Sequence, residues 1–119
     1  MIVHIVKRDD WKNAVRNGQY APESLDTEGF IHCSTPRQVV ETANIFYRGH
    51  SDLLIVCLEE AHLTSRLTYE PAVRLDDQRA EALFPHIYGP LNLEAVSEVY
   101  EFPCDAEGRF VLPGALNVA

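Results

Sequence analysis

Cysteine is scarce in this chain, and its spacing offers neither a disulfide framework nor a zinc site. Three cysteines occur among 119 residues, at Cys33, Cys57 and Cys104, and no two of them form a CxxC pair. Small secreted domains held by disulfides carry an even and denser set, so we expect reduced thiols here. Reduced thiols fit a reducing compartment, and we take the cytoplasm as the expected location.

Long apolar runs and basic patches are missing as well. No apolar run approaches the roughly 18–20 residues that cross a bilayer, and charged residues begin at Lys7, too early for a signal peptide. The 18 acidic residues outnumber the 10 basic ones, which gives a net charge of −8, and the basic residues are scattered. Phosphate backbones repel such a chain, so we expect neither a membrane nor nucleic acid as a partner. A small-molecule site with its own local charge is compatible with this balance.

The order of the expected elements predicts an α+β fold in a single domain of residues 1–119. Helices are expected over residues 11–17 and 36–48. No glycine-rich turn of a doubly wound nucleotide fold follows the first strand, so a mixed or antiparallel sheet is favoured. The apolar pattern predicts strands over residues 2–6, 30–33, 53–58, 67–71 and 96–102.

Three other segments are predicted to be irregular or short. Residues 84–90 contain two prolines and a glycine among aromatic side chains, which is typical of an ordered, irregular loop. Residues 76–82 are polar and predict a loop or a short helix. Residues 110–112 are expected to add a short extended piece near the C-terminal end.

Polar residues near the expected helix ends predict their caps. Asp9 or Asp10 can cap the first helix, and Gly18 ends it. Thr35 fits the N-cap of the second helix, and Gln38 completes a capping box with it.

The segment EGFIHCSTP, residues 28–36, places a histidine, a thiol and two hydroxyls in an otherwise apolar run. Alternation along a strand puts His32 and Ser34 on one side and Cys33 on the other. His32 and Ser34 then either bind a ligand at the strand end, or His32 is a hydrogen-bonded core residue while Ser34 and Thr35 cap the next helix. Capping is the favoured interpretation of the hydroxyls, and both interpretations of His32 stay open. Because Cys33 turns away from His32, we do not expect a catalytic thiol.

Two further histidines lie in apolar runs, His4 in IVHIV and His86 in FPHIYGPL. An isolated histidine on a strand face is more often a core residue with satisfied hydrogen bonds, unless His4 has His32 as its neighbour. His86 and Tyr88 either line a pocket or only pack their own loop.

Glu70 and Arg48 are the candidate charged residues, although each is more often a surface charge. Glu70 would supply a carboxylate to a positively charged transition state, and Arg48 would contact a phosphate. The three histidines His4, His32 and His86 would also suit a zinc ion with a bound water. No HxH or HExxH pair supports such a site, and we expect no metal.

Four segments together resemble a known bacterial family. These are IVHIVKRDDW, EGFIHCST, the helix ending in FYRG, and FPHIYGPL, and they closely resemble the family called domain of unknown function 952 over residues 1–102. Residues 103–119 lie outside the shared pattern as a C-terminal extension. The family is similar in fold to the ADP-ribosyltransferases. The resemblance therefore implies a compact split sheet, mixed or antiparallel, with two main helices, that cradles NAD.

The histidines resemble those of the RNA 2′-phosphotransferase branch, where one comes from the first core strand and one from the second. His4 and His32 occupy matching places here. The resemblance implies that His4 contacts the adenylate-side ribose or phosphate, and that His32, Ser34 and Thr35 grip the nicotinamide ribose. The acidic residue that many transferases place on a late strand has no certain match, and Glu70 or His86 is the candidate for its role.

The leading hypothesis is an NAD-dependent ADP-ribosyl transferase or NAD glycohydrolase. Its catalytic candidates are His32, Glu70 and His86. A non-enzymatic module that binds a nucleotide or another small ligand is the alternative, and a histidine-ligated metal hydrolase is a third. In the leading hypothesis NAD is the substrate and is held by His4, His32, Ser34, Thr35, Arg48 and Tyr88.

Overall fold

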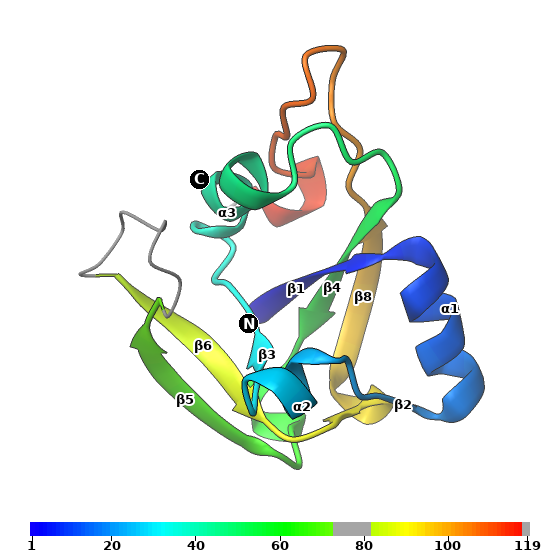
Figure 1. Ribbon diagram of the computed structural model, residues 1–119, viewed down its shortest axis with the longest axis vertical. Helices are drawn as coiled ribbons and strands as arrows, with labels where there is room; N and C mark the ends of the chain where they lie inside the picture. The colour runs from blue at the N-terminus through cyan, green and yellow to red at the C-terminus, as the bar shows by residue number, and fades with distance from the viewer. Residues whose placement is uncertain (73–81, 118–119) are drawn as a thin grey trace.

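The computed structural model has an α+β fold in which every described strand pair is antiparallel (Figure 1). It describes residues 1–72 and 82–117. The α-helices in these ranges are α1 (Arg8–Asn17), α2 (Ser24–Thr27) and α3 (Val39–Phe46). The strands are β1 (Ile2–Lys7), β2 (Gln19–Tyr20), β3 (Ile31–His32), β4 (Leu53–Leu58), β5 (Arg66–Pro71), β6 (Leu83–Tyr88), β7 (Leu91–Asn92) and β8 (Val96–Glu101). The predicted α+β class is confirmed, and α2 adds a short helix between the two expected ones.

One sheet, with strand order β1-β4-β8, separates two hydrophobic cores. Its middle strand β4 is buried along its whole length, as the continuous apolar run predicts. Alternation along β1 sends Ile2 and Val6 into the core under α1 and β2. Val3 and Ile5 enter the other core, under α3 and the C-terminal segment.

A second sheet has the order β3-β6-β5, and its middle strand corrects one prediction. Residues 84–88 were expected in an irregular loop, yet they pair with β5 and, at two positions, with β3. Pro85 fits because its carbonyl accepts a 3.0 Å hydrogen bond from the Cys33 amide, so its nitrogen faces the same way. The missing N–H removes the return bond to Cys33, and the pairing of β3 with β6 ends there.

Within the described ranges, the two three-stranded sheets meet at one β-bridge between Val3 and Ser34. These two residues exchange backbone hydrogen bonds of 2.8 and 2.9 Å. The bridge lies directly beside His4 on β1 and two residues after His32 on β3. It therefore brings the two histidine-bearing strands together, although they belong to different sheets.

The first helix begins earlier than its predicted cap. α1 starts at Arg8, and Lys7 occupies the N-cap without a side-chain hydrogen bond. Asp9 and Asp10 lie in the first turn, where the positive end of the helix dipole favours carboxylates, so the predicted capping role is wrong. Gly18 ends the helix at φ 83°, as predicted.

The capping box predicted before α3 is present in one half. The Thr35 amide donates to Gln38 Oε1 at 3.0 Å, and the Thr35 carbonyl accepts from the amides of Gln38 and Val39. Residues 36–38 form a turn, so the regular helix starts later than expected. The N-cap of α3 is Gln38 rather than Thr35, so the predicted N-cap is wrong and Thr35 stabilises the turn before the helix.

The C-terminal segment belongs to the second core. Phe110 is 2% exposed, and its ring centroid lies 4.8 Å from that of Phe102. Asn44 of α3 accepts a 2.8 Å hydrogen bond from the Phe110 amide and donates one of 3.3 Å to its carbonyl. The expected extended piece at 110–112 is therefore not a strand but a segment bound to α3.

None of the helices in residues 1–72 and 82–117 combines the length and apolar character needed to cross a membrane. A loop or short helix was also expected over residues 76–82, and this segment lies, apart from Ala82, outside the described residues.

Gly108 lies where the C-terminal segment turns against the loop after α3. Its φ is +79°, and a Cβ built on it would lie 2.8 Å from the backbone nitrogen of Gly49. At Gly18 (φ +83°) a Cβ would meet nothing within 4 Å. We expect Gly18→Ala to lower the free energy of unfolding by about 1–2 kcal/mol, and Gly108→Ala to lower it further because a backbone clash is added. Urea unfolding of both variants measures this, and equal losses would contradict the close approach.

Candidate functional site

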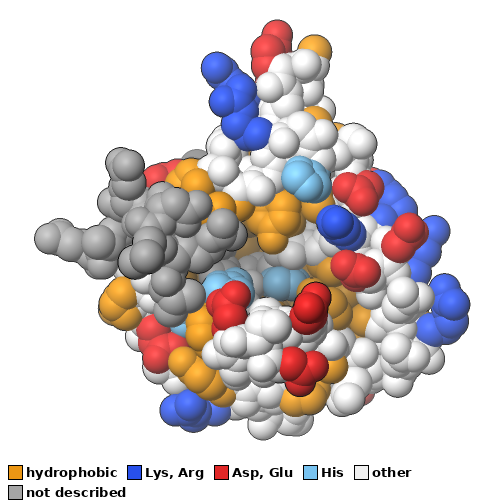
Figure 2. Space-filling model, viewed as in Figure 1, with side chains coloured by type: hydrophobic (Ala, Val, Ile, Leu, Met, Phe, Trp, Pro, Cys, Tyr) orange, Lys and Arg blue, Asp and Glu red, His pale blue; other side chains and the backbone are white. Residues whose placement is uncertain are grey.

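An open cleft of about 430 Å³ lies along β1, between α3 and the segment from β2 to β3. This volume is typical of small-molecule sites, which span about 300–1,000 Å³. Figure 2 shows the hollow, with histidine side chains at its base and acidic side chains at its rim. The polar and aromatic side chains that line it are His4, Lys7, Asp10, Tyr20, Glu23, Ser24, Glu28, His32, Ser34, Thr42, Phe46, Tyr47, Phe84 and His86.

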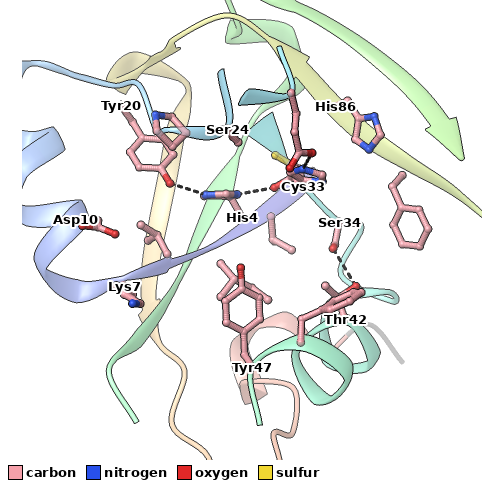
Figure 3. A pocket seen from close by; sticks show the side chains of 18 of the residues that line it. His4, Lys7, Asp10, Tyr20, Ser24, Cys33, Ser34, Thr42, Tyr47 and His86 are labelled. Atoms are coloured by element: carbon pink, nitrogen blue, oxygen red, sulfur yellow. Dashed lines mark hydrogen bonds and ion pairs between the residues drawn. The ribbon is translucent and has the colours of Figure 1, made fainter. Parts of the chain in front are cut away.

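His4 forms the floor of the cleft, and both of its ring nitrogens have partners (Figure 3). Nδ1 lies 2.6 Å from the carbonyl oxygen of His32, which only accepts, so Nδ1 carries the proton. Burial lowers the pKa of His4 to about 4, so the ring is neutral at pH 7. Nε2 therefore accepts from the hydroxyl of Tyr20 at 2.9 Å. His4 thus neighbours the backbone of His32 rather than its side chain.

His32 lies at the mouth of the cleft beside an acidic residue. Its Nε2 contacts the carboxylate of Glu28, and the two side chains are 40% and 41% exposed. Its cross-strand neighbour is His86, with ring centroids 5.6 Å apart. The strand alternation predicted for His32 is confirmed, because Ile31 and Cys33 belong to the opposite, core-facing side.

His86 comes from β6 and is buried between aromatic and acidic neighbours. Its ring stacks on Phe30 with centroids 4.1 Å apart. Its Nδ1 donates to Glu70 Oε1 at 2.9 Å, and the same oxygen accepts from the Tyr88 hydroxyl. These hydrogen bonds, from Tyr88 first and His86 second, lower the pKa of Glu70. The guanidinium of Arg66 lies 4.3 Å from the centre of the Tyr88 ring.

Ser34 and Cys33 follow β3 at the edge of the cleft, Ser34 with its hydroxyl on the cleft side and Cys33 with its side chain in the core. The Ser34 hydroxyl lies 3.5 Å from Oγ1 of Thr42 on α3 and is oriented to donate to it. Ser34 therefore lies at the cleft rather than capping the following helix. Cys33 is 6% exposed, and burial raises the pKa of its thiol, which fits the expectation that it is not a nucleophile.

Four of the sequence-predicted site residues do not line the cleft. Thr35 serves the turn before α3, and Arg48 donates from its guanidinium to the Glu107 carbonyl at 3.3 Å. Arg48 follows the end of α3, and its side chain contacts the C-terminal segment rather than the cleft. Glu70 and Tyr88 stand behind His86 and reach the cleft only through its ring.

The comparisons with known proteins decide the family. The family described as "Protein of unknown function (DUF952)" matches residues 5–99. The chain belongs to this family. The crystal structure of protein CC0527 from Caulobacter crescentus is 31% identical with a TM-score of 0.83, over 97% of this chain and 96% of that one. The NMR structure of CC0527 gives a TM-score of 0.75, over 91% and 89%. No match was found among curated proteins.

The family resemblance seen in the sequence is thereby confirmed, whereas the likeness to ADP-ribosyltransferases stays a prediction. Although the family match ends at residue 99, the CC0527 structure covers nearly the whole of this chain. The C-terminal segment was expected to lie outside the shared pattern. The structural match to CC0527 nevertheless extends over 97% of this chain, beyond the residues that the DUF952 family model covers.

Several cleft residues of this DUF952 protein were missed in the sequence. Tyr20 is placed by the two-residue pairing of β2 with β7, which carries too little pattern to predict. Tyr47 follows α3 as its C-cap and was taken as part of an apolar stripe. Glu28 stands four residues before His32 in the most distinctive motif of the chain, and that proximity was the available signal. Glu28 is the carboxylate beside His32 and lines the cleft itself, whereas Glu70 is bound to His86 and does not line it.

The described residues contain no group of three or more histidine, cysteine, aspartate or glutamate side chains placed to hold a metal ion. His4 uses both ring nitrogens within the protein, and His32 and His86 each bind a different carboxylate. The geometry therefore lends no support to the metal-hydrolase hypothesis.

Proposed function

We propose that the cleft binds NAD and that the protein cleaves its nicotinamide–ribose bond, passing ADP-ribose to an acceptor or to water. The observation that carries this proposal is the meeting of three distant histidine segments on one cleft. His4, His32 and His86 come from β1, β3 and β6, and all three line the same 430 Å³ space. His4 and His86 are buried in the cleft wall and His32 is half exposed at its mouth, so the three imidazoles border one open space from different strands.

The lining chemistry supports a nucleotide ligand. Aromatic side chains of Tyr47, Phe46 and Phe84 are part of the lining, and aromatic residues are common in the walls of small-molecule sites. Hydroxyls of Ser24 and Ser34 offer hydrogen bonds to ribose. A mixture of apolar walls with a few convergent polar groups is the usual make-up of such sites.

The charges of the cleft suggest how NAD would lie in it. Lys7 is the one lysine or arginine among the described lining residues, whereas Asp10, Glu23 and Glu28 are acidic. The diphosphate would therefore approach Lys7. The nicotinamide ring, which is positively charged in NAD, would lie near Glu28.

Glu28 also suits the chemistry of bond cleavage. Loss of nicotinamide develops positive charge on the ribose, and a fixed carboxylate stabilises that charge more than it stabilises the ground state. His32 holds Glu28 in place by a direct hydrogen bond at the cleft mouth. His4 has no free nitrogen for the ligand, so in this proposal it positions Tyr20 and the His32 backbone.

The test combines binding with product release. NAD at about 100 times its dissociation constant should stabilise the wild-type protein by about 2.7 kcal/mol in thermal unfolding, and nicotinamide should appear. His32→Ala removes a half-exposed ring, and we expect binding to weaken about ten- to hundredfold, the range for a lost hydrogen bond to a charged group. His62→Ala, an exposed histidine away from the cleft, is the matched control.

The outcomes separate the candidate functions. Absence of any stabilisation by millimolar NAD would remove the basis of the proposal. Binding without nicotinamide release would favour a non-enzymatic nucleotide-binding module. That alternative draws on one specific observation, because His4, His32 and His86 all engage protein partners through at least one ring nitrogen.

A further inference from the structure

His86 stands in the wall of the cleft with a carboxylate behind it. His86 is 2% exposed, and its ring is fixed by stacking on Phe30. Nδ1 donates to Glu70 at 2.9 Å, and the hydroxyl of Tyr88 donates to the same carboxylate oxygen. Ring orientation and tautomer are therefore both set from the side away from the cleft.

The other ring nitrogen of His86 faces the cleft. With the proton on Nδ1, the lone pair of the neutral ring is on Nε2. Within residues 1–72 and 82–117 Nε2 has no hydrogen-bond partner. Every fully buried side-chain nitrogen or oxygen in these ranges does have a partner, so Nε2 is not fully buried. The open space beside it is the cleft that His86 lines. His4 has both nitrogens occupied, and Nε2 of His32 is held by Glu28.

We propose that His86 is the general base that takes the proton from the acceptor, and that Glu70, held by Tyr88, positions it. This role rests on the proposed cleavage of NAD. With water as acceptor, the water oxygen bonds to the ribose anomeric carbon while its proton passes to Nε2 of His86. The carbon–nitrogen bond breaks, and its electron pair goes to the nicotinamide nitrogen, which neutralises the pyridinium. The products are ADP-ribose, nicotinamide and one proton.

The charged and titratable groups around His86 keep it a base at neutral pH. Burial lowers its pKa, and the charge of His32 on β3 acts in the same direction. The hydrogen bond to Glu70 on β5 and the charge of Glu28 oppose that effect. Tyr88 on β6 faces the carboxylate rather than the ring, and its own pKa is raised by that hydrogen bond. Arg66 on β5 covers the Tyr88 ring.

Two variants test the role with NAD as probe and water as acceptor. His86→Ala should retain NAD binding and lose about 10²–10⁴-fold in the rate of nicotinamide release, the usual contribution of a general base. Added imidazole should restore part of the rate. Glu70→Gln should keep the protein folded, lower kcat more than it changes KM, and move the acidic limb of the pH–rate profile to lower pH. That shift follows because the carboxylate no longer raises the pKa of His86.

A matched control for Glu70→Gln lies away from the cleft. Glu60 accepts a hydrogen bond from the Tyr69 hydroxyl, so Glu60→Gln repeats the chemistry of Glu70→Gln without touching His86. A Glu70→Gln profile with an unmoved acidic limb, or a His86→Ala rate equal to the wild-type rate, would overturn the inference and leave NAD cleavage standing. Failure of the wild-type protein to release nicotinamide would overturn both.

Discussion

Replacement of Phe110 by alanine is expected to lower the free energy of unfolding by about 3–5 kcal/mol, the usual cost of truncating a buried phenylalanine. The side chain is 2% exposed and contacts Phe102, which is fully buried. Asn44 binds both the backbone amide and the backbone carbonyl of Phe110, so the C-terminal segment cannot shift inward to fill the cavity that the lost ring leaves.

Val111→Ala is the matched control for this change. Val111 is the next residue along the chain and is 75% exposed, so its truncation should change the stability by less than about 0.5 kcal/mol. Urea unfolding followed by circular dichroism measures both variants. Similar midpoints for the two would show that the C-terminal segment is an appendage rather than part of the core.

The free energy of unfolding is also expected to fall by about 3 kcal/mol as the pH drops from 6.5 to 4, because His4 is buried in its neutral form. Its pKa is lowered from 6.5 to about 4 in the folded protein, chiefly by desolvation. Between those values the unfolded chain binds a proton that the folded chain does not. Acid therefore favours unfolding, and the full contribution of His4 is present only above pH 6.5.

Urea unfolding at half-unit steps of pH, on wild type and His4→Gln, measures this effect. The variant is less stable at pH 7, but its stability should decline less steeply in this window. The remaining slope belongs to His86, whose pKa is lowered in the same direction. Glu70 and Glu101 have pKa values lowered from 4.5, so their contributions begin to be lost at the acidic end of this window, as the pH falls below about 4.5. A wild-type slope in His4→Gln would show that another group controls the acid response.

Local pattern in the sequence was enough for the parts of the fold that depend on neighbours along the chain. The apolar run of β4 and the alternation along β1 and around His32 follow from burial on one or two faces of a sheet. Gly18 could be identified because the residue that ends α1 adopts a left-handed backbone conformation, which glycine favours. Each of these features is fixed within a few residues of sequence.

The features that were missed depend on contacts between distant segments. β6 was taken for a loop because Pro85 argues against a strand, and only the early end of β3 makes that proline acceptable. Arg48 was assigned to a phosphate from the chemistry of its guanidinium alone, and its position relative to the cleft depends on where α3 ends. Tyr20 was not considered, since its hydroxyl reaches His4 only after β2 has paired with β7.

The bridge between Val3 and Ser34 has a mechanical consequence. The β3-β6-β5 sheet carries His32 and His86, while the other three-stranded sheet carries His4, and within the described ranges two backbone hydrogen bonds join these sheets. The His4 side chain adds a third hydrogen bond across this joint, to the His32 carbonyl, and residues of both sheets pack in one core, among them Ile2, Val6, Ile31 and Ile87. The spacing of His4 from His86 is therefore set by this joint and by the core that both sheets share, rather than by strand pairing within either sheet.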